Sequence, residues 1–403
     1  MSGGRRLSRH RAALIANLAV ALAGFALIAL AAAAGQDWAD RHFLPTFAWS
    51  RSFQLGLIDA LRVLLALVGL FILLFVRPRV ARIVKARRGR RLLASALSAS
   101  LAIVAALVTT EGILHTRTWR ATQERWGSAE PQRRRDALLG WSFVPNHDGT
   151  ATVDGRVIDY ATDRFGYRVA GAGAQTDPSR PTIVFAGESI MHGYGLQWPE
   201  TIPAQVQAMT GIQAANIAIN AHATDQSYMR LRRELPRFAH PVAVVIPFVP
   251  ILFDRNLDED RPYLDANLRW NAAHPPDFRL VELARRVLRY RSADTIEEGI
   301  ATTQAVLRAT IALARSRGAA ALIVVPQLQP EDPTEAAIRH RVLDDAHLRY
   351  LLVPLEPSWR LAVDRHPNPR GAHAIAAAIA QALARSFQRV PQPAEPPSPQ
   401  GRQ

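Results

Sequence analysis

The chain has 403 residues, enough for a membrane segment and a separate domain with its own core. It contains no cysteine, which excludes disulfide bonds, thiolate metal ligands and a cysteine nucleophile. The formal net charge of +15 is local, because residues 1–11 hold four arginines and residues 77–91 hold eight Lys or Arg, with no acid in either stretch. Without these twelve residues the net charge of the chain is about +3. Basic residues confined to two short stretches are typical of the cytoplasmic flanks of membrane spans and argue against nucleic-acid binding.

Three apolar stretches in the first part of the chain are each long enough to cross a bilayer as a helix. They are residues 12–34, 55–76 and 92–114. Asn17 is the one clearly polar residue of the first, the second carries Asp59 and Arg62 at i and i+3, and the third carries Glu111 near its end. The length of the first stretch and the two spans after it favour a retained anchor over a cleaved signal peptide.

The distribution of basic residues predicts the orientation of this anchor. By the positive-inside rule, the N-terminus and the loop Arg77–Arg91 lie in the cytoplasm and residues 35–54 lie outside. Three spans then carry everything after His115 to the far side of the cytoplasmic membrane, which in a bacterium is the periplasm or outer surface. We therefore expect a multi-pass anchor over residues 1–115 and a linker or stalk over 116–137.

Residues 138–388 are predicted to form the second domain, in which short apolar strands alternate with helices. Residues 138–168 suggest a lead-in hairpin. The strands that follow are expected at 182–187, 216–219, 242–248, 320–327 and 350–355, and the helices at 199–209, 224–235, 296–317 and 369–388. This alternation implies an α/β fold with a parallel sheet covered on both faces. The stretch 254–290 is interpreted as a polar insertion, and residues 389–403 as a disordered Pro-rich tail.

Ser189 lies just beyond the first strand of this sheet, in GESIMHGYG. Ligands of open α/β sheets bind at the carboxyl ends of strands, so Ser189 is a candidate nucleophile. A serine nucleophile needs a base and an acid that orients the base, and DRHPNPRGAHAIA supplies Asp364 and His366. The plainer alternatives stay open at this point: a helix cap for Ser189, a surface loop for His366 and a turn for Asp364.

Other polar residues are interpreted as structural. His192 is expected to have a structural or substrate-contacting role, His373 to be packed or solvated on the last helix, and Asp225 to lie at a helix N-terminus. The acids of Asp254–Pro262 lack histidines at the spacing of a metal site, so we expect a solvated loop and no metal.

The three stretches GESIMHGYG, NIAINAHATDQ and DRHPNPRGAHAIA resemble conserved blocks of the SGNH, or GDSL-like, hydrolase family. The resemblance covers residues 138–388. It implies a flavodoxin-like three-layer sandwich with Ser189 as nucleophile, His366 as general base and Asp364 as the residue that orients it. It implies neither a metal nor an organic cofactor.

The sequence departs from this family at the positions that stabilise an oxyanion. Glu188 stands where aspartate is usual, and Ala221 stands where the family has a glycine whose N–H points at the oxyanion. The side-chain donor of the third block is an asparagine in the family, whereas Ile251 lies near that place here. Asn220 and Asn256 are the candidates to replace it.

Together these features predict a membrane-anchored serine esterase or O-acyltransferase acting outside the cytoplasm. Its substrates would be ester-linked acyl groups of envelope glycans, exported polysaccharides or lipids, and its surroundings the lipid bilayer. Two alternatives remain. The domain is a degenerate SGNH scaffold that binds glycans or partner proteins without turnover, or the chain is mainly a component of a membrane complex.

Overall fold

A computed structural model describes residues 3–45, 50–85, 98, 100–117, 130–274 and 277–388. The chain divides into two compact units. The first comprises residues 1–123 and 275–296, and the second comprises residues 124–274 and 297–403. The Pro-rich tail predicted at 389–403 and most of the predicted linker lie outside the described residues.

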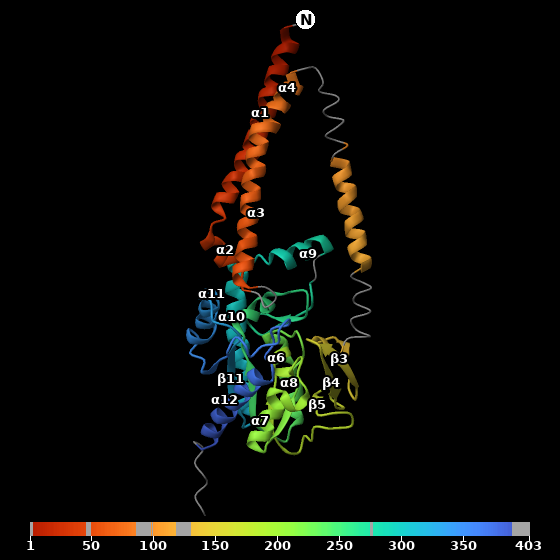
Figure 1. The fold of residues 1–403 in the computed structure, drawn as a ribbon, viewed down its shortest axis with the longest axis vertical. Helices are drawn as coiled ribbons and strands as arrows, with labels where there is room; N and C mark the ends of the chain where they lie inside the picture. Colours follow the sequence, from red (N-terminus) through yellow and green to blue (C-terminus); the bar gives the residue numbers. More distant parts are fainter. Residues whose placement is uncertain are drawn as a thin grey trace, which may run out of the picture. The chain divides into compact units, whose positions relative to one another are not determined.

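Long apolar helices make up the first unit (Figure 1). They are α1 (Gly3–Ala33), the short α2 (Gln36–His42), and α3 (Arg51–Phe71), which continues through a π-helical turn, Ile72–Val76, into α4 (Arg77–Lys85). Residues 13–33 and 51–80 are long and apolar enough to cross a membrane. α1 and α3 meet at two glycines, since a Cβ on Gly69 would lie 2.7 Å from the carbonyl oxygen of Gly24.

Polar side chains in these helices bond to neighbours. Arg62 forms a 2.7 Å ion pair with Asp59 and donates to the carbonyl of Ala31 on α1. Arg77 donates to the side chain of Asn17 at 2.8 Å. The few polar groups of the first two predicted spans therefore have partners within the helix pair.

The structure supports two of the three predicted membrane spans. Residues 98 and 100–117 are helical, but residues 91–97 and 99 lie outside the described residues. Among the described helices, only α1 and α3 with its continuation meet the length and composition of a span. The three-span anchor predicted from the sequence is thus reduced here to two candidate helices.

The second unit is built on a sheet with the strand order β12-β11-β8-β6-β7-β5-β4-β3. The parallel strands are β6 (Pro181–Phe185), β7 (Gln213–Asn216), β8 (His240–Pro247), β11 (Ala320–Gln327) and β12 (Tyr350–Pro354). Numbered along the chain, these five have the order 2-1-3-4-5, which is the flavodoxin-like order. The predicted α/β domain with a mostly parallel sheet is confirmed.

Three further strands extend the sheet in the antiparallel sense beyond β7. They are β5 (Arg168–Val169), β4 (Arg156–Thr162) and β3 (Asp148–Val153). The single lead-in hairpin predicted within 138–168 was wrong, because β2 (Gly140–Phe143) pairs with β1 (Arg133–Asp136) and β4 pairs with β3 and β5. A second small pair is β9 (Tyr263–Leu264) with β10 (Trp270–Asn271). The sheet is therefore mixed, with its antiparallel part at one edge.

Helices cover both faces of the sheet (Figure 1). On one face, α8 (Thr224–Glu234) and α10 (Ala293–Ser316) pack through Leu231 and Ala314 onto Val184 and Val244. α7 (Ile202–Thr210) and α12 (Pro369–Gln388) pack on each other, and α12 contacts β11 and β12.

The chain also has short helical segments. Those of the second unit are α6 (Ser189–His192), η2 (Trp198–Glu200), η3 (Leu235–Arg237), η4 (Pro250–Leu257), α11 (Pro333–Arg339) and η5 (His340–Asp344), and α9 (Arg279–Leu288) belongs to the first unit.

The stretch 254–290, interpreted as a polar insertion, contains several helical and strand elements. It contains most of η4, the β9–β10 pair and α9. Asp254, in the first part of that stretch, is buried. The solvated loop predicted at Asp254–Pro262 was wrong for its first part, because η4 continues to Leu257 and buries Asp254 and Leu257.

Glu335 on α11 makes the stability of the second unit depend on pH. It is buried, it accepts a hydrogen bond from Gln329, and burial raises the pKa of its carboxyl to about 7. An unfolded glutamate loses its proton near pH 4.5, so stability should fall as pH rises from about 4.5 to about 7, by up to ~3 kcal/mol. Urea unfolding at the two pH values should show this slope in the wild type, and Glu335→Gln should flatten it. An equal slope in both proteins would contradict the assignment.

Candidate active site

The end of β6 presents Ser189 on a tight turn. Gly187 has φ +146°, and a Cβ there would lie 2.7 Å from Cδ of Pro247 on β8, so only glycine fits this crossing. Glu188 is the N-cap of α6, and its carboxylate accepts the N–H of Ile190 at 2.8 Å. Ser189 is therefore the first residue of the helix and not its cap, so the cap alternative is wrong.

Ser189, His366 and Asp364 lie in one hydrogen-bonded line. Nε2 of His366 is 2.7 Å from Oγ of Ser189, and Nδ1 of His366 contacts Oδ1 of Asp364. Ser189 and His366 are 5% and 7% exposed, so the hydroxyl and the ring are shielded but reachable from one side. The structure thus brings the three predicted side chains together across 177 residues of sequence.

Local backbone geometry holds His366 in this position. Arg365 has φ +65°, the left-handed conformation, which turns the chain sharply between the acid and the histidine. The N–H of Leu361 donates to the carbonyl of His366 at 2.7 Å. The ring of Tyr194 packs 5.0 Å from the imidazole, between centroids. The Asp-x-His spacing therefore places both side chains through a strained turn.

Glu188 competes with His366 for the serine proton. Its Oε2 lies 2.9 Å from Oγ of Ser189, while Nε2 of His366 lies on the same hydroxyl. A hydroxyl has a single proton, so Oγ can donate to one of these two neighbours at a time. Glu188 is therefore a fourth residue of the site, since it contacts the same hydroxyl as His366.

The remaining residues singled out in the sequence have structural positions. His192 is fully buried between the rings of Phe143 and Tyr160, and burial holds the pKa of its imidazole well below its usual range. His373 on α12 bonds to Gln205, away from the serine. Asp225 is buried in the first turn of α8 and accepts the N–H of Leu264. These placements agree with structural roles.

The two backbone N–H groups predicted to stabilise an oxyanion are those of Ser189 and Ala221. Ala221 adopts φ +67°, the conformation for which the family uses glycine, and its carbonyl accepts from Arg261 at 2.9 Å. Among the described residues, neither the N–H of Ala221 nor that of Ser189 has an acceptor. Both N–H groups are therefore available to a ligand.

The two asparagines predicted as oxyanion donors differ in the hydrogen bonds that their side chains already make. Asn256 is not available, because its amide donates to the hydroxyls of Thr224 and Thr303 and its oxygen accepts the N–H of Thr224. Asn220 is buried, and its Oδ1 makes no hydrogen bond among the described residues. Ile251 is buried in η4. Asn220 is thus the better candidate of the two, and both remain predictions.

Ala221 is a position where a small change should raise stability. A non-glycine residue at positive φ costs about 1–2 kcal/mol, so Ala221→Gly should stabilise the protein by up to about 1 kcal/mol after the entropy of glycine is counted. The N–H is kept, so any reaction at Ser189 should be unchanged. Urea unfolding measures the gain. A loss of stability would show that the left-handed conformation is not adopted.

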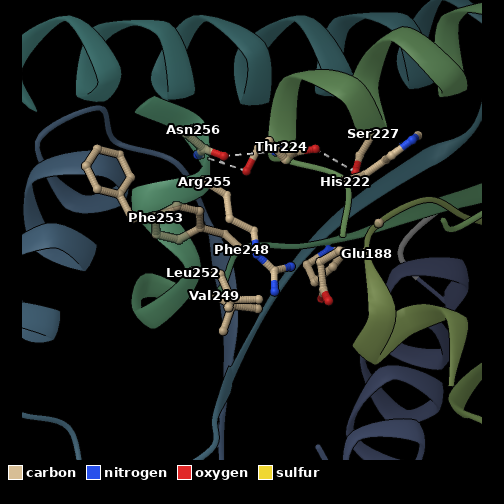
Figure 2. A pocket seen from close by; sticks show the side chains of 13 residues that line it. Glu188, His222, Thr224, Ser227, Phe248, Val249, Leu252, Phe253, Arg255 and Asn256 are labelled. Carbon is tan, nitrogen blue, oxygen red and sulfur yellow. Dashed lines mark hydrogen bonds between the residues drawn. The ribbon is translucent and has the colours of Figure 1, made fainter. Parts of the chain in front are cut away.

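A small pocket opens beside Glu188 (Figure 2). Figure 2 shows the guanidinium of Arg255 on the side of the pocket toward Glu188, with Leu252 and Val249 on its other side. His222 also lines it, and burial lowers the pKa of its imidazole well below the usual range. Sequence reasoning missed Arg255, although a basic residue in the segment after the third strand was a signal that could have found it.

No group of three histidine or acidic residues suited to a metal ion occurs in the part of the chain that the structure describes. The expectation that the reaction needs no metal and no cofactor stays a prediction.

Comparisons with known proteins give structural similarities alone. No family model and no curated protein matches the chain. A member of the lipolytic protein G-D-S-L family from Veillonella parvula is 11% identical, covering 51% of this chain and 98% of its own, with a TM-score of 0.31. An acetyl xylan esterase from Butyrivibrio proteoclasticus is 9% identical, covering 55% and 68%, with a TM-score of 0.34.

A GDSL-like lipase from Bacteroides thetaiotaomicron is 16% identical, covering 53% of this chain and 92% of its own, with a TM-score of 0.28. At such scores these similarities carry no weight beside the geometry of the site itself.

Proposed function

We propose that the chain is a membrane-anchored serine esterase or O-acyltransferase that acts on ester-linked acyl groups. The observation that carries this proposal is the 2.7 Å contact between Oγ of Ser189 and Nε2 of His366, whose other ring nitrogen contacts Asp364. A hydroxyl so placed can pass its proton to the imidazole as it attacks a carbonyl carbon. Asp364 holds the tautomer in which Nε2 accepts.

The reaction then runs in two balanced halves. In the first, the Oγ–carbonyl carbon bond forms, the ester C–O bond breaks, and the proton taken by His366 passes to the departing alcohol oxygen. In the second, water or an acceptor hydroxyl attacks the acyl-enzyme and gives its proton to His366. Ser189 leaves with that proton, and an acid or a new ester is released.

The charge that forms on the carbonyl oxygen would be met by the N–H groups of Ser189 and Ala221, which have no acceptor among the described residues. The side chain of Asn220 is the candidate third donor. Loss of one such donor costs about 10²–10³-fold in rate in other enzymes, so the site needs most of these three groups.

The proposed location follows from the apolar helices and the basic loops. If the stretch 92–114, whose start lies outside the described residues, forms the third span, the N-terminus and residues 77–91 would be cytoplasmic and the second unit would lie in the periplasm or at the outer surface. A site tethered there would meet acylated glycans, exported polysaccharides or lipids of the envelope.

One observation favours a second candidate function. Asn256 is engaged by Thr224 and Thr303, and Ile251 is an apolar residue near the place of the family's asparagine, so no asparagine among the described residues of this segment is free to act as the oxyanion donor. A domain that binds acylated glycans or partner proteins without turnover would have this feature.

Hydrolysis of p-nitrophenyl acetate by the full chain in detergent separates the two functions. Turnover by the wild type that Ser189→Ala abolishes, with an unchanged circular dichroism spectrum, is the result expected of an enzyme. Adding a soluble glycan acceptor then distinguishes transfer from hydrolysis by the mass of the product. A folded wild type without turnover would contradict the esterase assignment and favour binding.

A further inference from the structure

The segment 277–291 has large apolar side chains that are exposed among the described residues. It contains α9, and it links the β9–β10 pair of the second unit to α10 while belonging to the unit of apolar helices. Phe278 is 63% exposed, Val281 42% and Leu283 46%. Arg279 and Glu282 form an ion pair on the same short helix. The sequence of α9 is amphipathic, and Val281 and Leu283 flank the side of the helix that lies opposite Glu282.

The start of α9 is attached to the end of the third apolar stretch. The carboxylate of Glu111, in the helix over 100–117, accepts the N–H groups of Arg279 and Leu280, the latter at 2.9 Å. These are the first N–H groups of α9, which have no partner within the helix itself. An acid at this position also interacts favourably with the helix dipole. Glu111 therefore caps α9 from another part of the chain.

The other end is attached to the loop between α1 and α3. Tyr290 forms a β-bridge with Phe43, and Arg291 exchanges hydrogen bonds with His42, its N–H reaching the carbonyl at 2.9 Å. The ring of Tyr290 stacks on that of Trp38, with centroids 5.8 Å apart. Tryptophan and tyrosine gather at the boundary between lipid tails and water. The cluster lies just after the apolar helix α1.

Both attachments are to the same side of the predicted anchor. Residues 35–54 and the end of the stretch 92–114 are the two places where the predicted topology emerges from the membrane on the outer side. α9 is fixed between them, and Figure 1 draws it across the direction of α1 and α3. A helix in that place that opens an apolar side meets the lipid headgroup region.

We propose that α9 is an interfacial helix that lies in the outer leaflet of the membrane, with Phe278, Val281 and Leu283 among the lipid chains. This inference rests on the membrane anchor in the proposed function and does not depend on the chemistry at Ser189. Its consequence is a second membrane attachment of the catalytic unit, besides the N-terminal linker, because the chain leaves that unit after His274 and returns at Glu297.

Since the chain has no cysteine, single cysteines can report where this face lies. The full chain is reconstituted in phosphatidylcholine–phosphatidylglycerol vesicles with the substitutions Leu283→Cys, Leu67→Cys or Val157→Cys, and each thiol is labelled with an environment-sensitive fluorophore. Leu67, 57% exposed on α3, marks the bilayer core, and Val157, 61% exposed on β4, marks water. Quenching by spin-labelled lipid and by aqueous iodide is measured for each.

The proposal predicts that lipid quenching at 283 exceeds that at 157 by at least about twofold, with iodide quenching reduced to match. Iodide quenching at 283 equal to that at 157 would overturn it. Protection from both quenchers would overturn it too, because the face would then be covered by protein, such as a second copy. If the label at 67 escapes lipid quenching, the anchor itself fails and α9 with it, whereas ester hydrolysis by the same samples is unaffected.

Discussion

Replacing His366 by alanine should lower kcat for ester hydrolysis by about 10³–10⁴-fold or more, as loss of a general base does in other serine hydrolases. The reason is that Nε2 of His366 is the group on Oγ of Ser189 that can take a proton and return it to a leaving alcohol. Asp364→Asn should also lower the rate strongly, because an amide stabilises the wrong imidazole tautomer.

His373→Ala is the matched control for this comparison. His373 is a histidine of the same unit that bonds to Gln205 on α7, so its loss should leave kcat unchanged. Rates are measured on the full chain under one detergent condition, with folding checked by circular dichroism. Equal activity of His366→Ala and His373→Ala would show that His366 is not the base.

Replacing Arg168 by methionine should destabilise the second unit by about 3–5 kcal/mol, the largest stability effect we expect of a single substitution. Arg168 is 1% exposed and donates to the carbonyls of His192, Gly193 and Leu196, which follow Ser189 directly. Methionine fills similar space but removes the donor to the carbonyl of Leu196, while the carbonyls of His192 and Gly193 keep the amide of Asn216 and the N–H of Leu196. The guanidinium of Arg168 also lies 4.5 Å from the ring centroid of Tyr160, and this contact is lost with it.

The measurement is the urea midpoint of unfolding, with Arg180→Met as the control. Arg180 is exposed in the turn before β6, so its replacement should change stability by less than about 0.5 kcal/mol. Because the loop after Ser189 depends on Arg168, ester hydrolysis should fall together with stability. Equal midpoints for the two variants would contradict a role of Arg168 in holding this loop.

Much of the fold follows from the sequence because the parallel strands are short, continuous apolar runs. The strand predicted at 216–219 shows where this reasoning reaches its limit, since β7 is Gln213–Asn216. Gln213 looks unlike a buried strand residue, yet its amide bonds to Thr182 on the neighbouring strand. The N–H groups of Ile217 and Ile219 still donate to the carbonyls of Phe185 and Gly187, but the backbone after Asn216 is not a regular strand. Tertiary hydrogen bonds, not local apolarity, determined this register.

The candidate site was predictable to a similar degree. Ser189, Asp364 and His366 could be placed, because strand ends and an Asp-x-His turn are visible in the sequence. The oxyanion donors could not, because they depend on conformation and on distant partners. Ala221 adopts a left-handed φ, which the residue type alanine does not indicate. The amide of Asn256 is engaged by Thr224 and Thr303, both far from it in sequence.

The central claim is that Ser189 is an activated nucleophile, and labelling with a fluorophosphonate tests it most directly. The full chain is treated in detergent, digested and mapped by mass spectrometry. The account predicts an adduct on Ser189 in the wild type and none in His366→Ala, whose serine lacks its base. A folded wild type that stays unlabelled, or one labelled at another serine, would contradict it.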